Sequence, residues 1–168
     1  PETQMAALSA NTAMRRSIYH AIEEGLPCYA ECGGLIYLCR SLEWRGERVP
    51  MCGVIPADVV MHETPQGRGY MKYRENSAMP WPGGDFACTH YAHEFHYAAL
   101  KNVPPNATFA YEIIRGQGVD GLHDGFVYKH LLASFVHLRH VSAPSWTTRF
   151  IAFAQQCRNA PTGHSLST

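Results

Sequence analysis

One of the six cysteines, Cys32, lies in a short pattern that is typical of a catalytic nucleophile. Ala30 stands two positions before it and Gly34 two positions after it. A nucleophile on a strained turn between a strand and a helix needs small residues at these two positions. The N–H groups at the start of the following helix would favour a thiolate and lower the thiol pKa. We therefore expect Cys32 to be a nucleophile and the N–H of Gly33 to be one donor to an oxyanion. The alternative is a small buried cysteine beside a tight turn.

A thiol that attacks an amide needs an acid or base partner, and histidine is the usual one. Of the ten histidines, His137 directly follows an apolar strand that we expect at 131–136. Enzymes built on sheets collect their catalytic groups at strand ends. His137 is therefore the partner that we expect for Cys32. Six other histidines are interpreted as surface or hydrogen-bonded residues without an assigned role: His20, His62, His123, His130, His140 and His164.

A second segment rich in histidine, at 88–97, indicates a rival chemistry. Strand alternation would put His90, Glu94 and His96 on one face and His93 on the other. Such a face could bind a metal, so a metal-binding module built from Cys88 and these three histidines stays open. Structural zinc sites favour clusters rich in cysteine at fixed short spacing, and this segment holds one cysteine.

Composition limits the classes of function. The chain has 168 residues, 46% hydrophobic, which fits one domain with a sizeable core. Lys+Arg and Asp+Glu number 14 each, and the zero net charge argues against nucleic-acid and membrane-surface partners. No stretch reaches the roughly 20 apolar residues of a membrane span. The six cysteines form no Cys-x-x-Cys pair, so we expect reduced thiols and a cytoplasmic protein.

The elements around Cys32 are expected to be helix, strand, tight turn and helix. A helix is predicted at 11–24, where apolar residues recur every four positions and Asn11 can cap the start. A strand at 27–31 and a second helix at 35–42 would flank the turn. This order is typical of an α/β unit with a buried parallel strand.

The middle of the chain is expected to be rich in strands, with a helix after it. Clusters of proline and glycine separate runs of β-branched and aromatic residues. We predict strands at 51–61, 70–74, 89–97, 109–115, 126–128 and 131–136, and an amphipathic helix at 146–157. The fold class is therefore α/β with a β-rich insertion.

Four segments, taken together and in order, resemble one family. They are LPCYAECGGLIYL at 26–38, GRGY at 67–70, HEFHY at 93–97 and ASFVHL at 133–138. In this order they resemble the C-terminal class I glutamine amidotransferase domain of the cobyrinic acid a,c-diamide synthase family. The resemblance covers nearly the whole chain to about Cys157. It implies a flavodoxin-like, mostly parallel sheet flanked by helices.

By this resemblance Cys32 corresponds to the nucleophile and His137 to its histidine partner. Gly33 and Gly34 would contribute to the oxyanion and glutamine site. Many amidotransferases of this class carry Glu two residues after the catalytic histidine, but position 139 is Arg. The third member of the triad is therefore missing or supplied elsewhere, and Glu94 is one candidate.

The resemblance also implies partners outside this chain. The family's domain opens with Gly-Gly-x-Pro-Glu, whereas this chain begins at Pro1-Glu2, so we expect a glutaminase domain at 1–158, truncated at its start, and a flexible tail at 159–168. Ammonia from glutamine would pass to an N-terminal synthetase domain that uses ATP and Mg²⁺; no cofactor is expected in this chain. The acceptor would be a tetrapyrrole, either cobyrinic or hydrogenobyrinic acid or a sirohaem-type macrocycle. A non-catalytic domain that only docks a synthetase is the remaining alternative.

Overall fold

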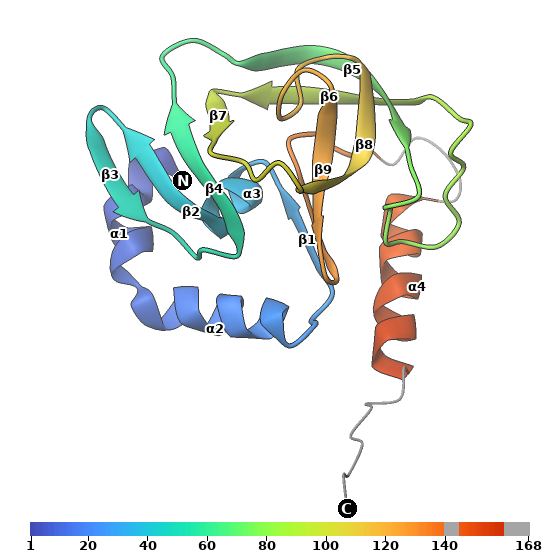
Figure 1. Ribbon diagram of the computed structural model, residues 1–168, viewed down its shortest axis with the longest axis horizontal. Coiled ribbons are helices and arrows are strands. Elements are labelled where there is room, and N and C mark those ends of the chain that lie inside the picture. The colour runs from blue at the N-terminus through green and yellow to red at the C-terminus, as the bar shows by residue number, and fades with distance from the viewer. Residues whose placement is uncertain (140–144, 160–168) are drawn as a thin grey trace, which may run out of the picture.

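The computed structural model describes residues 1–139 and 145–159. It contains two sheets, four α-helices and a 3₁₀ turn within those residues (Figure 1). The helices are α1 (Met5–Ala10), α2 (Thr12–Glu23), α3 (Gly33–Leu38) and α4 (Trp146–Asn159), and the 3₁₀ turn is Glu2–Gln4. The strands are β1 (Cys28–Glu31), β2 (Cys39–Trp44), β3 (Glu47–Pro50), β4 (Ile55–Met61), β5 (Gly67–Glu75), β6 (His90–His96), β7 (Ala98–Lys101), β8 (Thr108–Arg115), β9 (His123–Tyr128) and β10 (Leu131–Ser134).

The larger sheet carries the strand that leads to Cys32. Its order is β1-β10-β9-β8-β5-β6. Strands β1 and β10 run parallel, with Glu31 opposite Ser134, while every other pair in this sheet is antiparallel. The α/β class is confirmed, but the expectation of a mostly parallel sheet is wrong. Residues 116–122 join β8 to β9, and residues 129–130 join β9 to β10. Connections of this length are too short for the crossover of a dozen or more residues that a parallel pair needs, so these strands run antiparallel.

The β-rich middle of the chain adds a second sheet, with the order β3-β2-β4-β7. Five of the predicted strand regions correspond to β5, β6, β8, β9 and β10, and the region 51–61 contains β4. Strands β3 and β7 were not predicted. Strand β7 follows β6 after a single residue, Tyr97, at which the chain passes from one sheet to the other. Figure 1 shows β7 beside β4.

The predicted helix at 35–42 is wrong in extent. Helix α3 ends at Leu38, and Cys39 has an extended backbone with ψ of 171°. The reason is a long-range partner: Asp58 on β4 accepts hydrogen bonds from the Arg40 guanidinium and from the Ser41 hydroxyl. These contacts, together with the parallel pairing of β2 with β4, stabilise residues 39–44 as a strand.

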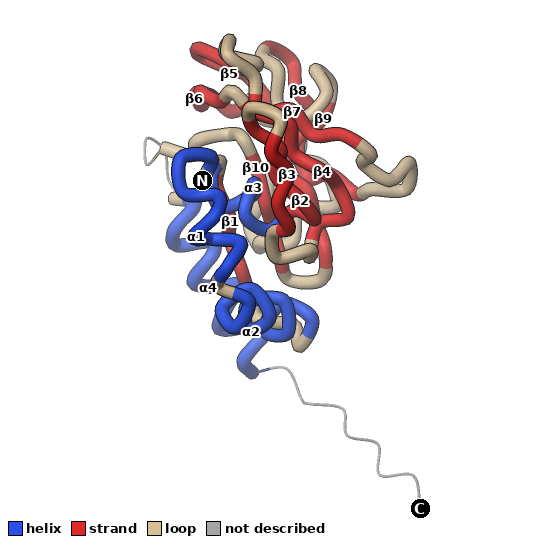
Figure 2. The backbone as a smooth tube through the Cα atoms, turned by 90° about the vertical axis from the view of Figure 1, so that its left-hand side faces the viewer, coloured by secondary structure: helices blue, strands red, loops and turns tan. Residues whose placement is uncertain are grey.

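Helix α2 agrees with the prediction in extent and start. Asn11 caps it, accepting a hydrogen bond from the N–H of Met14. Ile22 is buried, but Met14 at the other end of the expected apolar face is half exposed. Helices α1, α2 and α4 lie on one side of the strands (Figure 2).

The closing helix α4 reaches Asn159, two residues past its predicted end and one past the predicted domain boundary at 158. Apart from Asn159, the predicted flexible tail at 159–168 lies outside the described residues. Among the helices that the structure describes, none has the length and apolar character needed to cross a membrane.

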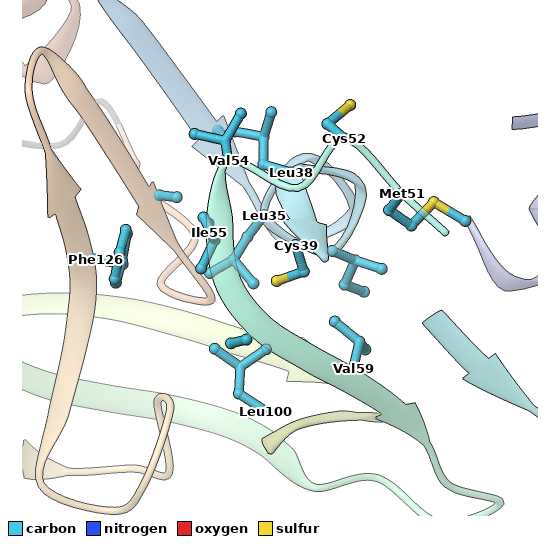
Figure 3. Close-up of a cluster of buried hydrophobic side chains, with 14 of the residues drawn as sticks. Leu35, Leu38, Cys39, Met51, Cys52, Val54, Ile55, Val59, Leu100 and Phe126 are labelled. Atoms are coloured by element: carbon cyan, nitrogen blue, oxygen red, sulfur yellow. The ribbon is translucent and has the colours of Figure 1, made fainter. Parts of the chain in front are cut away.

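The hydrophobic core has two parts. One surrounds α3, β2 and β4, with Leu35, Cys39 and Ile55 fully buried (Figure 3). The other lies under the larger sheet, where Phe153 of α4 joins Met71, Tyr111 and other buried residues. Because the first part encloses both ends of α3, it fixes the turn that carries Cys32 against the sheet.

Candidate active site

Cys32 occupies a strained turn between β1 and α3. Its backbone has φ of 47° and ψ of −99°, a conformation that residues with a side chain rarely adopt. The strain is maintained from both sides: the Cys32 N–H donates to the Ser134 carbonyl at 2.8 Å, and the Cys32 carbonyl accepts from the N–H of Ile36. The expectation of a tight strand-to-helix turn with the thiol at its tip is therefore confirmed.

The sulfur of Cys32 is less activated than the sequence indicates. Burial raises the pKa of the Cys32 thiol, and the hydrogen bond from the Gly33 backbone only opposes that rise. The expected lowering of the thiol pKa is therefore wrong for this state of the protein. Helix α3 has six residues, so few aligned peptide dipoles stand behind the sulfur. The Sγ atom lies 3.9 Å from the carbonyl oxygen of Phe95 on β6.

His137 lies directly after the loop that follows β10, next to His93 of β6. The His137 N–H donates to the His93 carbonyl at 2.8 Å, and the two rings are 4.9 Å apart between centroids. Burial lowers the pKa of His137, and the negative charge of Glu31 opposes this. No hydrogen bond joins the His137 ring to the sulfur of Cys32, although both residues are described. The structure brings the two to one end of the same sheet without a direct bond.

Glu31 is a residue of this region that the sequence analysis did not single out. One oxygen of its carboxylate accepts from the N–H of Leu138 at 3.1 Å and from the Tyr29 hydroxyl at 2.6 Å. The carboxylate therefore connects the residue before the nucleophile with the residue after His137. Its position directly before Cys32, in a strand that ends at the candidate site, was the available indication.

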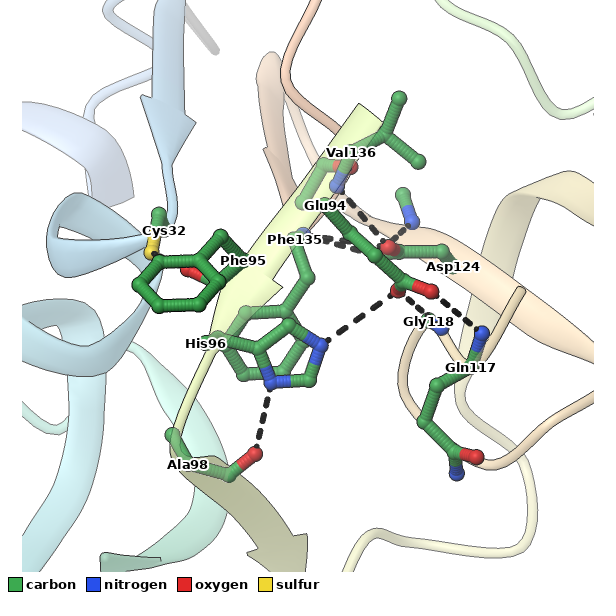
Figure 4. A network of polar contacts seen from close by, with 12 residues as sticks. Cys32, Glu94, Phe95, His96, Ala98, Gln117, Gly118, Asp124, Phe135 and Val136 are labelled. Carbon is green, nitrogen blue, oxygen red and sulfur yellow. Dashed lines mark hydrogen bonds and ion pairs between the residues drawn. The ribbon is translucent and has the colours of Figure 1, made fainter. Parts of the chain in front are cut away.

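Glu94 has a different setting from that of a triad acid. It is buried, and its two oxygens accept from the N–H groups of Gln117 and Gly118 at 2.7 and 2.9 Å. Its third neighbour is His96, whose Nε2 is 3.5 Å away. None of these contacts reaches His137. Figure 4 shows Glu94 and His96 pointing toward Asp124 and the 117–118 turn, whereas Phe95 points toward Cys32.

His96 is enclosed in the core instead of facing the thiol. Its ring stacks on Phe135 at 3.9 Å between centroids, and its Nδ1 lies 2.9 Å from the carbonyl of Ala98. Hydrogen bonds from the backbone of Phe135 and Val136 to the buried Asp124 fix the same loop from the other side. This loop leads directly to His137.

The rival metal module does not assemble in the described residues. No group of three or more His, Cys, Asp or Glu side chains is close enough there to hold a metal ion. His90 and His96 stand at opposite ends of β6, six residues apart, which is about 20 Å along a strand. Cys88 donates a hydrogen bond to Asp85 in the preceding turn.

The four segments on which the family resemblance rests meet around Cys32. Gly67, at the start of GRGY, pairs with His96 of HEFHY across β5 and β6. HEFHY contacts ASFVHL through the bridge between His93 and His137. The elbow contacts ASFVHL through Ser134 and HEFHY through Phe95. Segments spread over more than a hundred residues of sequence thus form one site.

Comparisons with known proteins agree with this arrangement. Residues 1–144 match the CobB/CobQ-like glutamine amidotransferase domain family. The cobyrinate a,c-diamide synthase of Magnetococcus marinus is 43% identical over 148 residues, covering 87% of this chain and 31% of that protein. The cobyrinate a,c-diamide synthase of Archaeoglobus fulgidus is 35% identical over 156 residues, covering 93% of this chain and 33% of that protein. The chain thus spans about a third of the length of these curated relatives.

Solved structures show the same fold at low sequence identity. A glutamine amidotransferase crystal structure matches with a TM-score of 0.60 and 16% identity, covering 88% of this chain and 71% of that one. A Thermoplasma acidophilum protein described as part of a GMP synthase matches with a TM-score of 0.51 and 18% identity, covering 90% and 67%. At these identities the likeness supports the amidotransferase-like fold alone.

Proposed function

Because the chain belongs to the CobB/CobQ-like glutamine amidotransferase domain family, we propose that it hydrolyses glutamine through Cys32 and supplies ammonia to an acceptor. The observation that carries the proposal is the strained backbone of Cys32 at the tip of the β1–α3 turn. A positive φ at a residue with a side chain costs free energy, and such strain is concentrated at functional sites. The turn holds the sulfur out of the sheet, beside the N–H of Gly33.

The first step forms a thioester. The thiol proton of Cys32 passes to the ring of His137 as the sulfur attacks the side-chain carbonyl carbon of glutamine. The Gly33 N–H donates to the oxygen that becomes negative. Gly33 and Gly34 are the first two residues of α3, and they form the backbone around this oxygen. The carbon–nitrogen bond then breaks, and the proton on His137 goes to the departing nitrogen, so that ammonia leaves and a glutamyl thioester remains.

The second step restores the enzyme. Water gives a proton to His137 while its oxygen attacks the thioester carbon, and the carbon–sulfur bond breaks. The proton returns to the sulfur, and glutamate leaves. Because burial lowers the pKa of His137, its ring is neutral near pH 7 and can accept a proton in both steps. Because burial raises the pKa of the Cys32 thiol, the reaction needs this base.

Glu31, rather than Glu94, is the acid that supports His137 in this proposal. Its carboxylate accepts a hydrogen bond from the backbone of Leu138. Burial lowers the pKa of His137, and the negative charge of Glu31 acts in the opposite direction. Glu94 serves the fold, since its hydrogen bonds hold the 117–118 turn. A nearby negative charge favours the protonated imidazole, so Glu31 helps His137 to hold the transferred proton.

The acceptor in this proposal is a tetrapyrrole with acetate side chains, as in cobyrinate amidation, within a longer enzyme. The relatives are named cobyrinate a,c-diamide synthases and are about three times the length of this chain, which supports a further synthetase domain as the partner. ATP and Mg²⁺ would act in that domain. The described residues of this chain offer no cluster of metal ligands.

A glutamine analogue that carries a diazo-ketone tests the nucleophile. Peptide mapping after brief labelling should find the modification on Cys32, with the other five cysteines unmodified. Cys88 is the matched control, because it is the exposed thiol and would react first with a reagent that has no affinity for the site. Labelling mainly at Cys88, or equal labelling in a Cys32→Ser variant, would contradict the proposal and favour a docking domain without catalysis.

A further inference from the structure

The outer face of strands β5 and β6 is exposed and rich in aromatic side chains. The strands pair so that Arg68 lies opposite Phe95, Tyr70 opposite His93, and Lys72 opposite Tyr91. Directly paired residues of adjacent strands point to the same side of a sheet. The residues between them, such as Met71, Ala92 and Glu94, are buried on the other side. We call the following six residues the β5–β6 face: Arg68, Tyr70, Lys72, Tyr91, His93 and Phe95.

Three aromatic side chains of this face are unusually exposed. Tyr70 is 77% exposed, Tyr91 65% and Phe95 46%. Neighbouring exposed aromatic side chains of this size mark a binding surface more often than isolated ones do. Figure 2 shows β5 and β6 at the rim of the molecule, away from helix α2.

The charge of the face is positive and uncompensated. The ammonium of Lys72 lies 5.4 Å from the centre of the Tyr91 ring, and the guanidinium of Arg139 lies 3.4 Å from Nδ1 of His93. None of the six residues of the face is acidic. Within the described residues, neither Arg68, Lys72 nor Arg139 takes part in an ion pair. An anionic occupant would provide the missing partners.

A cavity of about 500 Å³ adjoins this face. Tyr91 belongs to both, and Arg139, which contacts His93 of the face, also lines the cavity. The remaining walls come from the buried side of β5 and β6, from the loop before β6 and from helix α4. Arg149 of that helix is neutralised by a two-pronged ion pair with Glu75, at 2.7 and 2.8 Å. Sites for small molecules commonly measure about 300–1,000 Å³ and are lined by aromatic side chains. The cavity favours a small ligand over a flat protein surface.

The face also borders the candidate nucleophile. The carbonyl oxygen of Phe95 lies 3.9 Å from the sulfur of Cys32. In the proposed reaction, ammonia released from a glutamine bound at this sulfur would emerge beside the edge of the face. A carboxylate held there would be near the source of nitrogen, which matches the acceptor side of the proposed reaction.

We propose that the β5–β6 face and the adjoining cavity bind a planar polycarboxylate of the tetrapyrrole class, with its ring on the aromatic side chains and its carboxylates on Arg68, Lys72 and Arg139. This inference rests on the proposed function, because it assigns part of the acceptor's contacts to the glutaminase domain. Residues 68–72 extend about 13 Å along the strand, close to the width of such a macrocycle. Guanidinium groups and carboxylates form the strongest hydrogen-bonded ion pairs.

Uroporphyrin, a tetrapyrrole with eight carboxylates, is the probe for this site. Titration of the chain should quench the fluorescence of the bound porphyrin in a saturable way. Changing Arg68→Glu and Lys72→Glu together should weaken binding by tenfold or more, equivalent to about 1.4 kcal/mol. The control changes Arg16→Glu and Lys101→Glu together, which alters the net charge equally at exposed cations on α2 and β7. Binding to this control should match that of the unchanged chain.

The outcomes separate this inference from the proposed function. Equal weakening in both double variants would mean that uroporphyrin responds only to net charge, and absence of saturable binding would leave the face to a protein partner; either result overturns the inference. A Tyr91→Ala variant with unchanged affinity would overturn the stacking contact. Labelling of Cys32 by the diazo-ketone without porphyrin binding would overturn this inference alone, whereas porphyrin binding without labelling would overturn the proposed function.

Discussion

The carboxylate of Glu31 accepts a hydrogen bond from the N–H of Leu138 at 3.1 Å, across 107 residues of sequence. This bond ties the strand that ends at Cys32 to the segment that carries His137. The Tyr29 hydroxyl donates to the same oxygen at 2.6 Å and fixes its direction. The two candidate catalytic residues are thus positioned by one carboxylate between them.

Replacing Glu31 with glutamine tests the effect of its charge separately from the effect of its hydrogen bond. Glu31→Gln keeps an oxygen that can accept from Leu138 but removes the negative charge that raises the pKa of His137. The pKa of His137 should therefore fall further, and it can be followed by NMR titration of the ring protons. Glu47→Gln, an exposed change on β3, is the control and should leave the His137 pKa unchanged. An unchanged or higher His137 pKa in Glu31→Gln would contradict the role of this charge.

Asp124 should make the protein less stable as pH rises toward neutrality. It is fully buried, and burial raises its pKa to about 7. The folded state therefore retains a proton that the unfolded state has already lost above its ordinary pKa of 3.8. Between about pH 4 and pH 7 the free energy of unfolding should fall, by an amount on the order of a few kcal/mol.

Urea unfolding between pH 4 and pH 8 measures this effect in the unchanged chain and in Asp124→Asn, which carries no titrating group. The fall attributed to Asp124 should be absent from the variant. Asp120→Asn is the control, because the pKa of this more exposed carboxyl is lowered and its contribution has the opposite sign. A fall of the same size in Asp124→Asn would rule out Asp124 as its source.

Gly67 is expected to tolerate no side chain, because β5 passes directly over His96. A Cβ at this position would overlap the His96 ring and stand 2.7 Å from a carboxylate oxygen of Glu94. Overpacking of this kind usually costs about 1–3 kcal/mol of unfolding free energy. Gly67→Ala should therefore lower the stability measured by urea unfolding.

A double-mutant cycle shows whether the ring of His96 is the cause. In a His96→Ala background the space is partly vacated, so the added methyl group of Gly67→Ala should cost much less than in the unchanged chain. Residues in contact commonly show coupling free energies of about 0.5–3 kcal/mol. Additive losses from the two changes would place the strain elsewhere.

The sequence was sufficient where the pattern is local. The small residues around Cys32 predicted the turn, and strand alternation in 90–96 correctly separated the buried side of β6 from its exposed side. The cap at Asn11 placed the start of α2. In each case the deciding interactions lie within a few residues, so the order of residues along the chain contains them.

The remainder depends on contacts between distant segments. Residues 39–42 were predicted to continue α3, and distant partners make them a strand: Asp58, which binds Arg40 and Ser41, and strand β4. Glu31 lacks a distinctive spacing, because its partner Leu138 becomes its neighbour only when β1 pairs with β10. The pKa of the Cys32 thiol is raised because the folded chain buries it. A sequence pattern that marks the start of a helix carries no information about this burial.

The last prediction concerns the complete enzyme of which we propose this chain is the glutaminase part. Cys32→Ala should abolish amidation that uses glutamine, because the sulfur that forms the thioester is gone. Amidation from added ammonia should continue, because the methyl side chain leaves the acceptor site and its ATP-dependent activation untouched. Cys39→Ala is an unsuitable control, since Cys39 lies in the core. Cys157→Ala, a partly exposed thiol on helix α4 outside both the elbow and the cavity, serves instead and should use both nitrogen sources. Measuring product with each source distinguishes a lost nucleophile from a damaged fold, which would lower both rates together. Continued use of glutamine by Cys32→Ala at the parent rate would remove the elbow from the mechanism.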